Sequence, residues 1–120
     1  MAAISGKATQ RISVDVATSG DNTVITFPTT GGFDNLGPRG AIHVTHFILQ
    51  NTSDTAYTVI VKDGTSTNMN GDGFLLAANG GSMSFDGGPT PLVLSSKTDL
   101  VLNVSVNAKQ LSGWIIYYIE

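Results

Sequence analysis

The sequence predicts an all-β fold, an antiparallel β-sandwich of jelly-roll-like architecture with about seven or eight short strands. Apolar and polar residues alternate over several short segments, as in strands with one buried face. Clusters of Gly, Asn, Asp and Ser separate these segments at roughly 8–12 residue intervals. Residues typical of exposed helix faces are scarce, since glutamate occurs once and lysine four times.

Each strand follows from its own pattern. Residues 11–16 alternate, since Ile12, Val14 and Val16 point one way and Arg11, Ser13 and Asp15 point the other. A turn at 19–22 follows, which predicts a hairpin with a second strand over 23–27. Further strands are expected at 41–50, 56–62, 82–85, 92–94, 100–106 and 111–119. The strand at 56–62 is expected to pair back with 41–50. Residues 28–40 and 63–73 are expected to form long loops.

The length of 120 residues predicts one domain, with an N-terminal arm at 1–10 and a single β-sandwich domain at 11–120. The absence of cysteine excludes disulfides and cysteine-based zinc sites. The start of the chain lacks an apolar core of signal-peptide length, and the longest apolar run, 114–119, is far shorter than a membrane helix. We therefore expect a soluble protein made in the cytoplasm, without membrane contact.

Charge argues against nucleic-acid binding. The formal net charge is −3, and the six basic residues are scattered along the chain: Lys7, Arg11, Arg39, Lys62, Lys97 and Lys109. Nucleic-acid affinity depends on clustered Lys and Arg that neutralise phosphates. We expect no nucleic-acid partner.

The sequence offers little catalytic chemistry. Residues three apart on a regular strand lie on opposite faces, so His43 and His46 are not expected to share a metal ion. No Gly-x-Ser-x-Gly segment marks a nucleophile, and the aspartates sit mostly in turns. We expect no enzymatic activity, no catalytic residue, no metal and no cofactor.

One loop has a sequence pattern loosely like that of a cation-binding loop. Residues 68–73 (NMNGDG) alternate oxygen-bearing side chains around glycine, loosely as in calcium loops. The acidic ligand that usually closes such a site is missing, because Phe74 begins an apolar run. The pattern favours an ordinary tight loop.

Apolar residues on both faces of two strands predict covered strands, either inside the sandwich or against another subunit. In the last strand, Trp114, Ile116 and Tyr118 share one face, and Ile115, Tyr117 and Ile119 share the other. We expect some of the apolar residues on these strands to pack in the core and others to contact another subunit or a partner. The candidates are Phe47, Leu49, Trp114, Ile116 and Tyr118. Exposed aromatic residues would equally suit stacking on sugar rings.

Several segments carry a family resemblance. These are residues 19–23 (SGDNT), 76–81 (LAANGG), 100–105 (LVLNVS) and 112–114 (SGW) followed by Tyr117 and Tyr118. Together they resemble small β-sandwich proteins encoded among the virion genes of tailed phages, which include capsid decoration (cement) proteins. They span most of the chain from Arg11 onward, whereas the loops 28–40 and 63–73 do not share the likeness.

The resemblance implies a jelly-roll-like virion subunit on the capsid surface, a homotrimer that binds the major capsid protein between capsomers and stabilises the phage head. The arm at 1–10 and the two long loops are then expected to contact the shell. Two alternatives remain from the residues themselves. One is a carbohydrate- or receptor-binding module of a phage tail or fibre, and the other, weaker one is a hydrolase on a β-scaffold.

Overall fold

The computed structural model describes residues 9–29, 40–106 and 110–120, and these residues form strands, turns and loops without a helix. The all-β prediction is confirmed. The strands are β1 Gln10–Val16, β2 Gly20–Ile25, β3 Ile42–Asn51, β4 Tyr57–Asp63, β5 Thr67–Asn68, β6 Phe74–Leu76, β7 Ser82–Asp86, β8 Leu92–Val93, β9 Leu100–Val104 and β10 Leu111–Ile119. Part of the predicted arm, residues 1–8, lies outside the described residues, as do 30–39 and 107–109.

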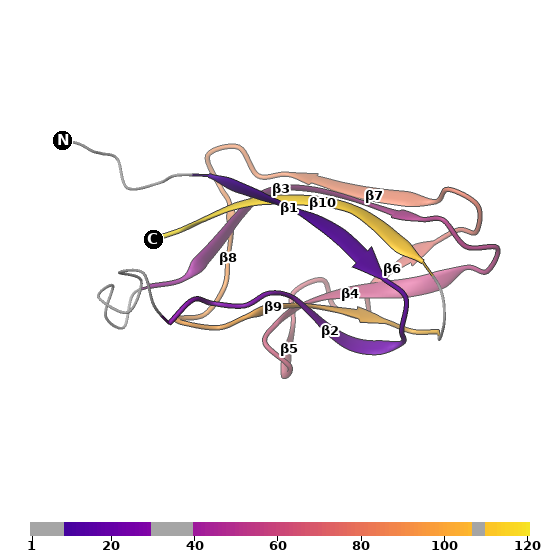
Figure 1. Ribbon diagram of the computed structural model, residues 1–120, viewed down its shortest axis with the longest axis horizontal. Coiled ribbons are helices and arrows are strands. Elements are labelled where there is room, and N and C mark those ends of the chain that lie inside the picture. Colours follow the sequence, from indigo (N-terminus) through magenta and orange to yellow (C-terminus); the bar gives the residue numbers. More distant parts are fainter. Residues whose placement is uncertain (1–8, 30–39, 107–109) are drawn as a thin grey trace.

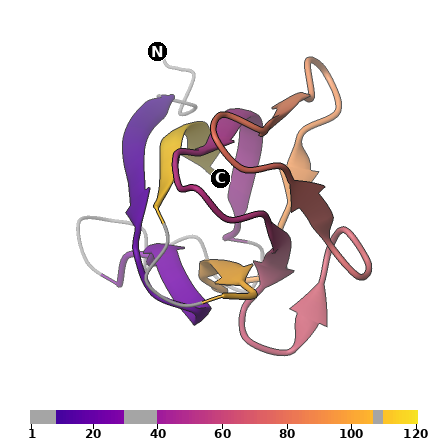
Figure 2. The same ribbon diagram turned by 90° about the vertical axis from the view of Figure 1, so that its right-hand side faces the viewer.

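The strands form two antiparallel sheets that pack face to face (Figure 1). Sheet I has the order β1-β10-β3-β7, and β8 also pairs with β3. Sheet II has the order β2-β9-β4-β5, and β6 also pairs with β4. Viewed along the long axis, β1 and β2 lie on one side of the sandwich, and β6 and β7 lie on the other (Figure 2). The expected β-sandwich is therefore confirmed.

The strand order is that of a jelly roll. The first half of the chain pairs with the second half in reverse, β1 with β10, β2 with β9, β3 with β7 and β8, and β4 with β5 and β6. Pairs β10–β3 and β9–β4 then join these ribbons into two sheets. The ten strands fill eight positions, because β7 and β8 together form one edge of sheet I, and β5 and β6 together form one edge of sheet II. Eight strands in two sheets with this winding define the jelly-roll architecture.

Two predictions of strand pairing are wrong, the hairpin of 11–16 with 23–27 and the pairing of 41–50 with 56–62. β1 lies in sheet I and β2 in sheet II, and β3 and β4 are divided between the sheets in the same way. The turn residues Gly20 to Asn22 already belong to β2, where they pair with β9. Alternation of apolar residues specifies which face of a strand is buried, but two strands joined by a turn can bury that face equally well in facing sheets.

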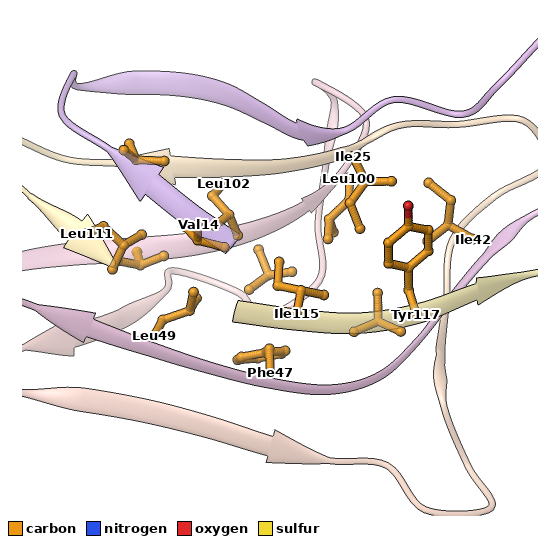
Figure 3. Close-up of a cluster of buried hydrophobic side chains, with 14 of the residues drawn as sticks. Val14, Ile25, Ile42, Phe47, Leu49, Leu100, Leu102, Leu111, Ile115 and Tyr117 are labelled. Carbon is orange, nitrogen blue, oxygen red and sulfur yellow. The ribbon is translucent and has the colours of Figure 1, made fainter. Parts of the chain in front are cut away.

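The core lies between the sheets and consists of the inward side chains of both (Figure 3). Sheet I contributes Val14, Leu49 and Ile115, and sheet II contributes Leu100 and Leu102, all buried. The predicted buried face of 11–16 is confirmed by Val14 and Val16, and of the two apolar faces predicted for 111–119, the one with Ile115, Tyr117 and Ile119 is the inward face. Strand β3 is central in sheet I, as its consecutive apolar residues predict.

A buried tyrosine gives the fold an alkaline limit. The Tyr57 hydroxyl donates a hydrogen bond to the carbonyl of Gln110 at 2.6 Å, and burial raises the pKa of Tyr57 to about 12. An unfolded tyrosine loses its proton near pH 10, so between about pH 10 and 12 the folded state retains a proton that the unfolded state releases. Stability contributed by Tyr57 is therefore lost as the pH rises through this window.

We expect the free energy of unfolding of the wild type to fall more steeply between about pH 8 and pH 11 than that of Tyr57→Phe. Urea unfolding at both pH values measures the difference. Tyr117, whose pKa burial also raises, titrates in both proteins and serves as their common background. Equal losses in the two proteins would contradict the assignment of the alkaline limit to Tyr57.

Candidate interaction surface

The outward side chains of sheet I lie in cross-strand rows. Strand pairing places Trp114 between Ser13 and Ile48 in one row, with Ser84 beyond Ile48. The next rows are Arg11, Ile116, His46 and Asp86, and then Tyr118, His43 and Val93. Cross-strand neighbours of this kind contact one another on the sheet face.

The middle of these rows forms an apolar stripe, which we define as Ile48, Trp114, Ile116, His43, Tyr118 and Val93. Trp114 is 39% exposed, Ile48 38% and Val93 48%. Ile116, His43 and Tyr118 are half-buried. Charged groups flank the stripe, Arg11 on β1 and Asp86 on β7. An apolar centre with a polar rim is the usual composition of a protein contact surface.

A β-bulge places both histidines on this outer face. His46 lies opposite Ile116 and Val44 lies opposite Tyr117, so Thr45 is an extra residue in β3. The Thr45 hydroxyl donates to the carbonyl of Ile116 at 3.1 Å. The prediction that His43 and His46 lie on opposite faces is therefore wrong, because one inserted residue reverses the alternation beyond it.

The two histidines have different surroundings. The His43 ring stacks on Tyr118 with centroids 4.6 Å apart, and its Nδ1 atom is buried without a hydrogen-bond partner. His46 Nε2 lies 3.0 Å from an Asp86 carboxylate oxygen, and Nδ1 lies 3.1 Å from the Thr45 hydroxyl. Stacking holds His43 within the stripe, whereas His46 links the stripe to its acidic rim.

The structure divides the five predicted contact residues into two groups. Phe47 and Leu49 are buried in the core, and Figure 3 shows both between the sheets. Trp114, Ile116 and Tyr118 lie together on the outer face of β10. The surface part of the predicted set is thus confined to β10, and its contact with a partner stays a prediction.

Sequence reasoning missed Ile48 and Val93, which complete the stripe on β3 and β8. Ile48 carries a signal, because it separates Phe47 and Leu49 and must face away from them on a regular strand. Val93 carries a weaker signal, since β8 is two residues long and its face depends on its pairing with β3.

Sheet II has a polar network on its outer face. Lys62 on β4 reaches across β9 to Asp21 on β2, with Nζ and Oδ1 3.1 Å apart, and Asn103 donates to the same oxygen at 2.8 Å. The hydrogen bond from Asn103, followed by that from Lys62, lowers the pKa of Asp21. The Lys62 stem crosses over Val101, its neighbour on β9, which is buried. This network occupies on sheet II the place that the apolar stripe occupies on sheet I.

The loop after β4 uses its polar groups internally. The Asn70 side chain accepts the N–H of Val61 at 2.8 Å and donates to the carbonyl of Val59 at 3.2 Å, so it extends the pairing of β4. Within the described residues, no group of three or more His, Asp or Glu side chains is arranged to hold a metal ion. In the same residues, no helix has the length and apolarity to cross a membrane.

Comparisons with known proteins give no match by sequence and a distant likeness by structure. No family model matches the chain, and no curated protein matches its sequence. Among solved structures, the chain is similar to the cryo-EM structure of a virus-like particle of the extra small virus of the giant freshwater prawn Macrobrachium rosenbergii, with 11% identity, a TM-score of 0.43, and coverage of 99% of this chain and 82% of that chain. Our assignment of the fold therefore depends on the strand order alone.

Fold and surface together define the class of the protein. It is a jelly-roll β-sandwich with a polar network on one outer face and an apolar stripe on the other.

Proposed function

We propose that this chain is a virion structural subunit, and specifically a capsid decoration (cement) protein that binds the major capsid protein between capsomers on the phage head. The observation that carries the proposal is the apolar stripe on sheet I, an exposed band that a partner surface would remove from water. The role is structural rather than catalytic.

Three features support this function. Jelly rolls build capsid subunits, although lectins and cupins share the architecture, so fold by itself does not decide. All of the stripe except Val93 lies on β10 and β3, which pair with strands on both sides, so it offers a rigid surface that loses little entropy on binding. The turn and strand segments that resemble tailed-phage virion proteins lie in the same jelly roll. The trimer that this resemblance implies stays a prediction.

The stripe is tested with Trp114→Ser. Because Trp114 is 39% exposed, a partner that covers it removes roughly 60–100 Å² of its surface from water, which contributes about 1.5–2.5 kcal/mol, so we expect binding to capsids that lack this protein to weaken about tenfold or more. Co-sedimentation with such capsids measures the affinity. Leu75→Ser is the matched control, because Leu75 is 73% exposed on β6 of sheet II and should leave affinity unchanged. Equal binding by wild type and Trp114→Ser would contradict the proposed surface.

A second candidate function is carbohydrate or receptor binding by a tail or fibre module. One observation favours it, since Trp114 lies in one row with the hydroxyl residues Ser13 and Ser84. An aromatic ring beside hydrogen-bonding groups suits a sugar ring. Glycan-array binding that Trp114→Ser abolishes, together with no affinity for capsids, would favour this function over the first.

A further inference from the structure

Strand β1 is an exposed edge with unusual regularity. It pairs with β10 through all seven of its residues without a register shift, and no strand in the described part of the chain pairs with its other side. Figure 2 shows it at the left edge of sheet I. The remaining sheet edges are interrupted or short, since the register of β2 shifts after Thr23, β5 and β8 have two residues each, β6 has three and β7 five.

An edge of this kind presents unpaired backbone N–H and C=O groups that can pair with another strand. Proteins usually protect such edges with charged side chains, lysine above all, or with proline or a bulge. Strand β1 (QRISVDV) has no lysine, proline or bulge, and its two charged residues, Arg11 and Asp15, have opposite signs, so they can attract a second copy of the strand rather than repel it. Gln10, Arg11, Ser13 and Asp15 are exposed, and an opening lined by residues 13–16 of β1 and 22–24 of the strand below runs beside the edge. The edge is therefore accessible to a second strand.

The charges on β1 are symmetric about Ser13. Arg11 lies two residues before Ser13 and Asp15 two residues after it, and all three face outward. In an antiparallel pair of two β1 strands centred on Ser13, Arg11 lies opposite Asp15 of the partner subunit, and Ile12 lies opposite Val14 of the partner subunit. A shift by one residue would place outward side chains opposite inward ones, and a shift by two would separate both charge pairs.

We propose that two copies of this chain associate through β1 in this register, about a two-fold axis at Ser13. The contact is isologous, so each Arg11–Asp15 pair occurs twice, and the two copies of sheet I become one continuous sheet. This inference goes beyond the proposed function and does not depend on it. It uses a different surface from the apolar stripe, and an assembly in which every chain makes this contact contains an even number of chains.

The first measurement is the solution mass by light scattering coupled to size exclusion. The pairing predicts about 25 kDa, twice the 12.5 kDa of one chain, or a larger even multiple. A mass of one or three chains would overturn the proposal. Capsids are absent from this measurement, so its outcome is separate from that of the Trp114→Ser binding experiment.

Charge reversal tests the register. Arg11→Asp places the new carboxylate opposite Asp15 of the partner subunit, and Asp15→Arg places the new guanidinium opposite Arg11 of the partner subunit. Each variant alone is expected to pair at least about tenfold more weakly than the wild type, because two attractive pairs become repulsive. An equimolar mixture of the two variants should pair again, since every facing charge in the mixed pair is then opposite. Circular dichroism confirms that each variant is folded.

Asp72→Arg is the matched control. Asp72 is exposed in the loop before β6, and its substitution changes the net charge by the same amount as Asp15→Arg. This variant should keep the mass of the wild type. Three results would overturn the register: wild-type mass for both β1 variants, failure of their mixture to pair, or dissociation by Asp72→Arg as well.

Discussion

Replacing Gly113 by alanine is expected to lower the free energy of unfolding by at least about 3 kcal/mol. Gly113 lies in β10 between Val14 of β1 and Leu49 of β3, with a φ of +152°. A Cβ atom at this position would lie 1.9 Å from the carbonyl oxygen of Ile48, far inside van der Waals contact. Because the obstacle is backbone in the centre of sheet I, relief requires β3 and β10 to separate.

Urea unfolding of Gly113→Ala and the wild type measures this loss. Gly71→Ala is the control, because Gly71 also has a positive φ, +65°, but its Cβ would have no heavy atom within 4 Å. The control shows the cost of a positive φ in a left-handed turn without a steric clash, about 1–2 kcal/mol. Similar losses in the two variants would show that β3 and β10 do not approach as closely as the structure indicates.

Removing the side chain of Asn51 is expected to cost about 3 kcal/mol, since four hydrogen bonds of a fully buried amide would be lost together at about 0.5–1.5 kcal/mol each. Asn51 ends β3 and is fully buried. Its amide donates to the carbonyls of Thr55 and Leu76 at 2.8 and 3.2 Å. Its oxygen accepts the backbone N–H and the hydroxyl of Ser53 at 2.8 and 2.7 Å. One side chain thus fixes the crossing from sheet I to sheet II.

Asn51→Ala is compared with Asn68→Ala by urea unfolding at neutral pH. Asn68 is exposed, and its amide makes one hydrogen bond, to the carbonyl of Gly71 at 3.2 Å. The control should cost less than about 1 kcal/mol. A cost for Asn51→Ala no larger than that of the control would mean that the crossing is held by other contacts.

The sequence allowed most of the strands to be predicted, because alternation reports directly on burial, but it missed β6 and also β5, which lies in the expected loop 63–73. In β10 it correctly separated Ile115, Tyr117 and Ile119 from the outer residues. Partner strands were not predictable in this way. The pairing of β1 with β10 joins segments about a hundred residues apart, and no local pattern encodes it.

The candidate surface was predictable in part. The outer face of β10 with Trp114 follows from alternation, and so does Ile48 once the direction of β3 is fixed. The positions of His43 and His46 were not predictable, because they depend on the bulge at Thr45, which nothing in the local sequence marks. The symmetric placement of Arg11 and Asp15 about Ser13 is visible in the sequence. It suggests pairing between two copies only once β1 is known to be a sheet edge.

We propose above that this jelly roll is a structural subunit of the capsid surface. Cryo-electron microscopy of particles purified from the host that produces the chain, with protein quantification of the same particles, tests it most directly. We expect many copies per particle, with density of this fold between capsomers and the outer face of sheet I against the major capsid protein. Absence from the particles, or a few copies confined to the tail, would contradict it.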